Sequence, residues 1–273
     1  MPDPLQPEPI LQRRLIDPPW SRPKGLNLPG ISPVGADDWL RMDDAYGAQM
    51  ALRDRLIVER VASVHDLRPA ALDPAQELLD DTLDLIAPWS GFERGSDWCQ
   101  RPDGVRVPLD RNAPLLTLGR LVQEDLCILQ PHGDEQVLTG AILCFPASWT
   151  LAEKIDRPLI GIHTPVPEYD GDVAARVQRL FHAIRPGRPL MRGNCLLYAD
   201  PSLYQPRREG APRVRTGIRA DYLRTERQCL LRLARTGAVV FTIHTTVVAR
   251  KDLTPADQAA LAAHKGIETV GGA

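Results

Sequence analysis

The stretch Ala238–Val248 constrains the fold of this chain more than any other. Its sequence, AVVFTIHTTVV, consists largely of β-branched residues, which favour the pleated surface of a sheet. Alternation gives it two faces, Val239/Phe241/Ile243 and Val240/Thr242/His244. The stretch therefore predicts a long strand, in which His244 lies on the more polar face and has a structural role.

The size and charge of the chain limit the classes of protein to which it can belong. Its 273 residues are enough for one large domain or two small ones with a sizeable core. A net charge of -2 does not predict nucleic acid as a partner. The proline-rich N-terminus has no apolar signal-peptide core, and no apolar run reaches the length of a membrane span. We expect a cytoplasmic protein that binds neither nucleic acid nor membrane.

The five cysteines are scattered and form no C-x-x-C pair; they are Cys99, Cys127, Cys144, Cys195 and Cys229. This pattern argues against a disulfide scaffold, a zinc ribbon and a cysteine-ligated iron–sulfur cluster. We expect mostly buried thiols in a reducing compartment.

Residues 1–36 are rich in proline and predict an extended N-terminal arm that wraps the surface of a domain. Hydrophobic spacing and capping residues predict the elements that follow. The expected helices cover 39–64, 73–87, 171–184, 222–235 and 255–264, with a short helical piece at 151–155. The expected strands cover 126–130, 136–145, 190–199 and 238–248; the first two form a hairpin, and 192–194 interrupts the third. A short extended piece is expected at 214–218.

Two adjacent acids, Glu124 and Asp125, stand inside an apolar run. A buried ionised acid must be paired or hydrogen-bonded. The pair is therefore either a cap with a salt bridge to an arginine or a set of pocket acids.

His163 closes a second apolar run and precedes Pro165 and Pro167. These prolines stiffen the loop after the histidine, because they fix their own backbone and bias their neighbours toward extended conformations. A metal or haem ligand has to be aimed by its backbone, so His163 is a candidate ligand. The alternative is a hydrogen-bonded histidine at the end of a strand.

Glu226 is the candidate acid–base residue. Within the expected helix it falls on the apolar stripe that contains Tyr222 and Leu233, and it should point inward, whereas Arg224 and Arg227 should reach outward or to the rim. Desolvation would raise the pKa of an inward carboxyl toward acid–base use. A buried structural pair of this glutamate with an arginine is the alternative.

Arg192 and Asn194 stand at the head of an apolar strand, where they could bind a carboxylate or a haem propionate; a surface turn is the alternative. Residues 205–235 carry nine arginines against three acids. This excess of positive charge could bind anionic groups of a cofactor or dock an acidic electron-transfer partner, or it could form a solvated face. The common nucleotide-binding, hydrolase and zinc motifs are absent from the sequence.

Several segments, in order, resemble the family of haem-dependent oxidative N-demethylases. They are LVQEDL at 121–126; Trp149, Glu153, Lys154, RPL at 157–159 and IHTPVP at 162–167; RGN at 192–194; and LRTERQ at 223–228 with RTGAVVFTI at 235–243. The chain departs from the family pattern at Cys195, where tryptophan is usual, at Ala234, where proline is usual, and at His244, where a basic residue is usual.

The resemblance implies an α+β fold: a PAS-like antiparallel sheet with flanking helices, forming a single haem-binding domain over 37–273 behind the arm. It implies haem b with His163 as the iron ligand, Glu226 as a catalytic pocket carboxylate, and Arg192, Asn194, Arg224 and Arg227 as cofactor contacts.

The implied reaction is O2-dependent N-demethylation of a small, dimethylamine-like alkylamine. Electrons would come from NAD(P)H through flavin and an iron–sulfur cluster on a separate reductase. A haem-binding sensor or carrier without turnover, and a small-molecule-binding module without haem, are the alternatives.

Overall fold

The computed structural model describes residues 3–22, 30–163, 171–211, 220–263 and 269–270. Within these ranges the largest element is an eight-stranded sheet, in which every pairing is antiparallel except that of β11 with β8. Its strands, in spatial order, are β1 (Ser32–Pro33), β8 (Leu190–Tyr198), β9 (Tyr222–Arg232), β10 (Val239–Ala249), β6 (Asp125–His132), β7 (Glu135–Ile142) and β2 (His65–Leu67), with β11 (Thr269–Val270) beside β8.

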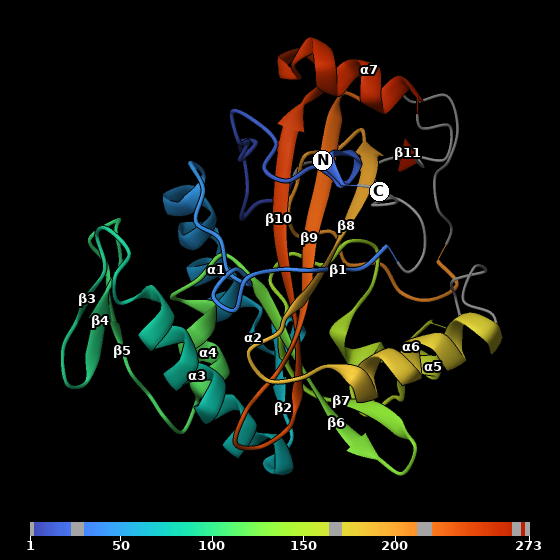
Figure 1. Ribbon diagram of the computed structural model, residues 1–273. Coiled ribbons are helices and arrows are strands. Elements are labelled where there is room, and N and C mark those ends of the chain that lie inside the picture. The colour runs from blue at the N-terminus through green and yellow to red at the C-terminus, as the bar shows by residue number, and fades with distance from the viewer. Residues whose placement is uncertain (1–2, 23–29, 164–170, 212–219, 264–268, 271–273) are drawn as a thin grey trace.

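Helices lie on both faces of this sheet (Figure 1). One group is α1 (Tyr46–Glu59), α2 (Val61–Val64), α3 (Leu72–Ile86) and α4 (Pro114–Gly119), next to a small sheet of β3 (Glu93–Arg94), β4 (Trp98–Gln100) and β5 (Arg106–Pro108). The other group is α5 (Leu159–His163) and α6 (Gly171–Ala183), and α7 (Pro255–Ala263) follows β10. Single 3-10 turns occur at Pro19–Ser21, Pro69–Ala71, Leu151–Glu153 and Arg250–Asp252. None of the helices in the described ranges is long and apolar enough to cross a bilayer.

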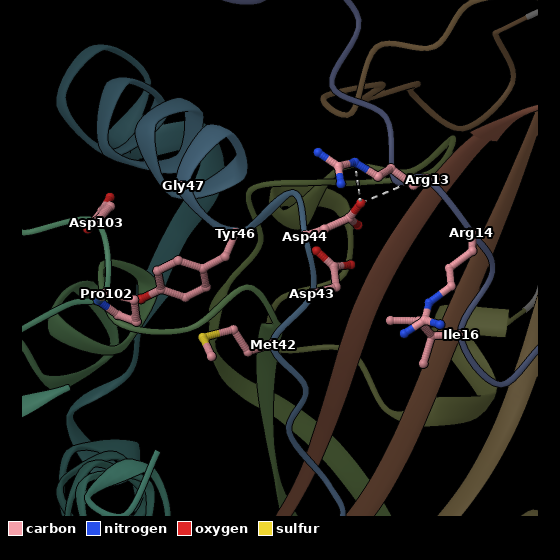
Figure 2. Close-up of a pocket in the computed structure, with 10 residues that line it drawn as sticks. All are labelled: Arg13, Arg14, Ile16, Met42, Asp43, Asp44, Tyr46, Gly47, Pro102 and Asp103. Atoms are coloured by element: carbon pink, nitrogen blue, oxygen red, sulfur yellow. Dashed lines mark hydrogen bonds and ion pairs between the residues drawn. The ribbon is translucent and has the colours of Figure 1, made fainter. Parts of the chain in front are cut away.

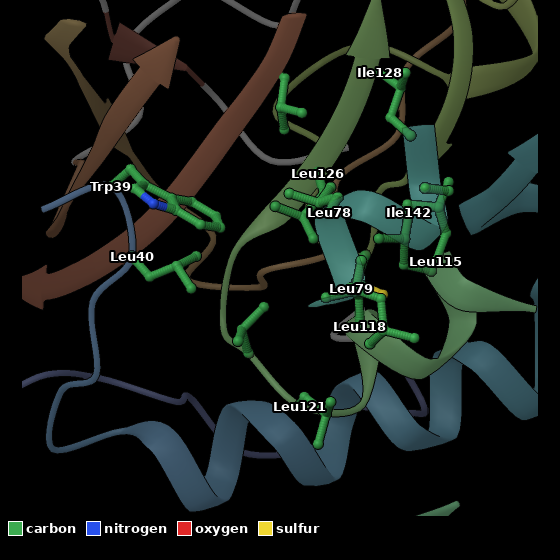
Figure 3. Packing of buried hydrophobic residues seen from close by; sticks show 14 of the residues in the cluster. Trp39, Leu40, Leu78, Leu79, Leu115, Leu118, Leu121, Leu126, Ile128 and Ile142 are labelled. Atoms are coloured by element: carbon green, nitrogen blue, oxygen red, sulfur yellow. The ribbon is translucent and has the colours of Figure 1, made fainter. Parts of the chain in front are cut away.

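The main core lies between the sheet and the group that contains α1, α3 and α4 (Figure 3). Leu78 and Leu79 of α3 and Leu118 of α4 are completely buried there, against Leu126 and Ile142 of the sheet. Burial of each such side chain contributes about 1.5–3 kcal/mol. This core therefore fixes one face of β6 and β7 and leaves the opposite face to α5 and α6.

The predicted α+β class with a large antiparallel sheet and flanking helices is confirmed. The hairpin of 126–130 and 136–145, the strand at 238–248 and the helices at 73–87, 171–184 and 255–264 are present with bounds shifted by up to three residues. The finer description of the sheet as PAS-like stays a prediction. The expected extended piece at 214–218 lies outside the described residues.

The predicted helix over 222–235 is wrong, because this segment is strand β9. Its arginines, glutamate, glutamine and leucines have good intrinsic helix propensity, but eleven residues pair in register with β10 and nine pair with β8. A hairpin joins β9 to β10, and Gly237, with φ 72°, supplies the left-handed residue of its turn. Pairing with two long neighbours therefore outweighs local propensity here.

Three other predictions need correction. The helix expected over 39–64 begins only at Tyr46, because the side chains of Glu124 and Gln123 accept hydrogen bonds from the backbone N–H groups of Arg41 and Asp43 and hold that segment extended. The strand β8 runs without a break through 192–194. His163 is the last residue of the short helix α5 and does not end a strand.

The N-terminal arm packs against the sheet. The backbone N–H of Gln12 donates to the Val247 carbonyl at 2.9 Å, and its side chain is buried. Pro19 lies so close to Gly193 of β8 that a Cβ atom at position 193 would come within 2.7 Å of the proline ring. The close approach explains why glycine stands in the middle of a strand.

One buried arginine joins α1 to the start of β6. Arg53 is fully buried; it binds the Asp125 carboxylate at 2.8 Å and donates to the carbonyls of Gly119, Gln123 and Glu124. Asp125 also accepts the backbone N–H groups of Cys144 and Phe145. The sequence left two interpretations of Glu124 and Asp125, and for Asp125 the structure confirms the salt bridge to an arginine.

We predict that Arg53→Met destabilises the protein by about 3–5 kcal/mol, because it leaves a buried carboxylate without its cation. Arg111→Met is the control, since Arg111 pairs with Asp80 where both side chains are about half exposed. Such a surface pair contributes about 0–1 kcal/mol. Urea unfolding of the three proteins measures the difference, and equal midpoints for the two variants would contradict the prediction.

Candidate functional site

Polar side chains gather on the face of the sheet that α5 and α6 cover. On β9 alternation places Arg224, Glu226 and Gln228 on this face. In the register, Asn194 of β8 and Thr245 of β10 lie directly on either side of Glu226. We call the set Arg192, Asn194, Arg224, Glu226, Gln228 and Thr245 the polar face.

Glu226 is buried at the centre of the polar face, with 7% of its surface exposed. Its Oε2 accepts a hydrogen bond from Gln228 Nε2 at 3.0 Å, and Nε of Arg224 lies 3.4 Å from its Oε1. The sequence correctly placed Glu226 in the interior, but through a helix that does not exist. Two neighbours on its own strand fix the orientation of this carboxylate.

Arg224 is buried, so the prediction that it reaches outward is wrong. It donates to the carbonyls of Leu203 at 3.0 Å and Phe145 at 2.6 Å, and its guanidinium carbon lies 5.8 Å from the centre of the Tyr198 ring. These contacts anchor Arg224 in the protein and leave its Nε for Glu226.

Arg192 extends from β8 onto the polar face and is partly buried. Burial lowers the pKa of its guanidinium, and the nearby charge of Glu226 opposes that shift. Among the residues that the structure describes, the buried Nε of Arg192 has no hydrogen-bond partner, and neither has the hydroxyl of Thr245. A buried donor without an acceptor is costly, so this part of the polar face is suited to an anionic or hydrogen-bonding ligand.

Arg227 lies on the opposite face of β9, so the structure does not bring it together with Arg192, Arg224 and Glu226. It is 6% exposed, which corrects the prediction that it points outward. It donates to the backbone carbonyl of Asp38 at 2.5 Å and forms ion pairs with the carboxylates of Asp38 and Asp17. These contacts give Arg227 a role in holding the arm.

The backbone of His163 ends α5, and its side chain lies outside what the structure describes. Leu159, at the start of α5, packs with Phe181 of α6 and with Val239 and Leu230 of the sheet. Leu230 and Glu226 share one face of β9, because they are four residues apart. The helix that ends at His163 therefore covers the same face of the sheet as the polar face.

A cleft of about 730 Å³ opens elsewhere, beside the start of α1 (Figure 2). Its lining comprises Arg13, Arg14, Ile16, Met42, Asp43, Asp44, Tyr46, Gly47, Pro102 and Asp103, and includes none of the six predicted site residues. Several of its polar groups already have partners: Asp44 binds Arg13, Asp103 binds Arg101, and the Tyr46 hydroxyl donates to the Leu121 carbonyl. We therefore prefer the polar face as the candidate site.

Behind this cleft, His244 is buried between two acids. Its Nε2 lies 3.1 Å from Asp43 Oδ2 and its Nδ1 lies 3.0 Å from Glu124 Oε1. Burial lowers the pKa of His244, but the two carboxylates outweigh burial and raise it to about 9. The imidazole is thus a cation at neutral pH held between two carboxylates, which agrees with the structural role predicted for this residue.

The five cysteines are buried and free, as predicted. Burial raises the pKa of every one of these thiols, to about 11 in Cys229 and to about 12 in Cys144 and Cys195, so they remain protonated at neutral pH. Within the described ranges, no group of three or more His, Cys, Asp or Glu residues is placed to hold a metal ion.

A family model described as haem-dependent oxidative N-demethylase, alpha subunit-like, matches residues 30–272. The chain belongs to this family. No curated protein matches the chain. The family description indicates haem dependence and oxidoreductase chemistry, and the match begins within the arm, at its last seven residues.

The sequence analysis of this member of the haem-dependent oxidative N-demethylase family missed two residues of the polar face, Thr245 and Gln228. Thr245 continues the alternation of Phe241 and Ile243, so a polar residue at the end of an apolar strand face could have marked it. Gln228 belongs to a segment that carries the family resemblance, but the predicted helix concealed its position, because Gln228 and Glu226 share a face only in a strand.

We predict that stability falls as pH rises from about 6.5 to 9. His244 has a folded pKa near 9, above the 6.5 of an unfolded histidine, so its contribution is complete below 6.5 and is lost through 9. The free energy of unfolding falls by at most roughly 3 kcal/mol over this range. Urea unfolding across this range checks it, and His244→Gln should flatten the pH dependence; an unchanged slope in that variant would contradict the assignment.

Proposed function

We propose that the protein is a haem-dependent monooxygenase that N-demethylates a small, dimethylamine-like alkylamine. The observation that carries the proposal is the buried Glu226 carboxylate beside Arg192, whose buried Nε has no hydrogen-bond partner among the described residues. Both lie on the sheet face covered by the helix that ends at His163. The family supports haem dependence and the general kind of reaction.

The residues present fit a haem b group. The buried Nε of Arg192 needs an acceptor, and a haem propionate is a carboxylate that would supply one. Asn194 lies on the same face of β8, two residues further along, as a second propionate contact. His163 is the proposed iron ligand. When bound, haem supplies the binding and reductive activation of O2.

The proposed role of Glu226 is to bind the substrate as an ammonium ion. A secondary alkylamine is protonated at neutral pH, and a carboxylate in a poorly solvated site attracts a cation more strongly than it would in water. Gln228 and Arg224 hold both oxygens of Glu226, so the carboxylate can orient the N-methyl group and accept the ammonium proton. Thr245 can offer its hydroxyl to the same substrate.

The proposed reaction consumes one O2, two electrons and two protons for each methyl group. It yields the demethylated amine, formaldehyde and water. We propose that the electrons come from NAD(P)H through flavin and an iron–sulfur cluster on a separate reductase, and that the protein is a single cytoplasmic domain, over 37–273, with an N-terminal arm. Arginines in the basic stretch 205–235, such as Arg207 and Arg208, are candidates for docking an acidic reductase.

The first test is an absorption spectrum of the purified protein with and without added haemin. We predict a Soret band that shifts with dithionite and CO, and that His163→Ala removes or alters it. His182→Ala, in α6, is the control and should keep the spectrum, because the His182 side chain is exposed and bonds to the Gln178 carbonyl of its own helix. Absence of a Soret band after reconstitution would overturn the haem assignment.

The second test addresses the substrate site. Glu226→Gln should weaken the spectral response to dimethylamine by at least about 30-fold while haem content stays unchanged, since removing one partner of a buried charge pair costs about 2–5 kcal/mol. Thr225→Val is the matched control, because Thr225 is buried next to Glu226 but on the opposite face of β9. Haem binding without amine-dependent O2 uptake would favour a sensor or carrier.

A further inference from the structure

Lys154 is one of the most buried charged side chains near α5. Only 5% of its surface is exposed, and it directly follows the 3-10 turn Leu151–Glu153. Lysine is almost never buried to this extent unless it is paired, because transfer of an ammonium group out of water is costly. The side chain therefore needs a structural or functional explanation.

The ammonium group of Lys154 has two hydrogen-bond acceptors, one on α5 and one far along the chain. Its Nζ donates to the backbone carbonyl of Ile162 at 2.7 Å and to Oε1 of Glu209 at 2.5 Å. Ile162 immediately precedes His163. The ammonium group thus links the C-terminal end of α5 to a carboxylate from a distant part of the chain.

Further contacts hold Glu209 in place. Its backbone N–H donates to both carboxylate oxygens of Glu153, at 3.0 and 3.2 Å, and the Thr150 hydroxyl donates to Glu153 at 2.5 Å. Arg157 binds Glu209 Oε2 at 3.2 Å. Lys154 consequently has a fixed counter-ion, and three of the residues involved belong to segments that carry the family resemblance.

Helix α5 is too short to hold its own end. It has five residues, and its last carbonyls have no donor within the helix. The backbone bond from Ile162 N–H to the Pro158 carbonyl, at 2.9 Å, fixes only one turn. A cation at the C-terminus satisfies a free carbonyl and also interacts favourably with the helix dipole.

We propose that Lys154 is a positioning residue for His163: with Glu209, it fixes the end of α5 and so the direction in which the chain presents that histidine. The inference rests on the proposed function, because it takes His163 as the haem ligand. It assigns Lys154 no contact with substrate or iron. Ligands held to within about 0.5 Å need support of this kind from the surrounding residues.

The experiment compares haem-loaded Lys154→Met, Lys154→Arg, Glu209→Gln and Arg157→Met with the unmodified protein. Arg157→Met is the matched control, since Arg157 also binds Glu209, but its side chain is 45% exposed and, within the described residues, donates no hydrogen bond to α5. The readouts are the electron paramagnetic resonance spectrum of the ferric haem and the rate of haem transfer to apomyoglobin. Circular dichroism confirms folding.

We expect Lys154→Met to broaden or split the ferric signals and to speed haem loss about 10- to 100-fold, the usual effect of removing the support of a metal ligand. Lys154→Arg should restore much of both properties, because it keeps a donor and the charge. Glu209→Gln should have a smaller effect in the same direction, and Arg157→Met should resemble the unmodified protein.

If Lys154→Met has the ferric spectrum and the rate of haem loss of the unmodified protein, the positioning role is overturned, even when His163→Ala loses the haem signal. A haem spectrum that His163→Ala leaves unchanged would instead overturn the proposed ligand, and the positioning role with it. If Lys154→Met does not fold, Glu209→Gln decides: altered ferric signals support the proposal, and unaltered signals overturn it.

Discussion

The arrangement of the whole molecule depends on the buried ion pair between Arg53 and Asp125. The guanidinium binds one carboxylate and three backbone carbonyls, which fixes helix α1 against the segment that leads into β6. The same carboxylate fixes the chain that leaves β7, through the backbone of Cys144 and Phe145. A charge taken out of water is tolerated only when it is fully bonded, so this pair allows little variation in how helix and sheet meet.

Strand β9 distributes charge to both faces of the sheet. On one face Arg227 binds Asp17 of the arm and Asp38, and on the other Arg224 binds Glu226. The adjacent side chains of Glu226 and Arg227 therefore serve different purposes, because Arg227 holds the arm and Glu226 forms part of the polar face. This explains why β9 lacks the simple alternation of apolar and polar residues that is typical of strands with one solvent-exposed face.

The sequence predicted elements whose hydrophobic pattern is strong. The β-branched stretch of β10 and the apolar stripe of α3 are present because their burial agrees with their local propensity. The prediction failed at β9 and at the start of α1, where long-range pairing and the side chains of Gln123 and Glu124 decide the conformation. In the site, residue type singled out Arg192, Asn194, Arg224 and Glu226 together, but only the strand register separates Arg227 from them.

The turn between β9 and β10 has a consequence for how this protein can evolve. It spans only 233–238, with Gly237 as its left-handed residue. Insertion or deletion of a single codon here must either distort the turn or shift the register of β9 against β10 by one residue, and such a shift exchanges the two faces of the strand. A register shift would turn Glu226 toward Asp17 and Asp38, and Arg227 would replace it on the polar face. We expect gene lineages to vary the residues of this turn while keeping its length.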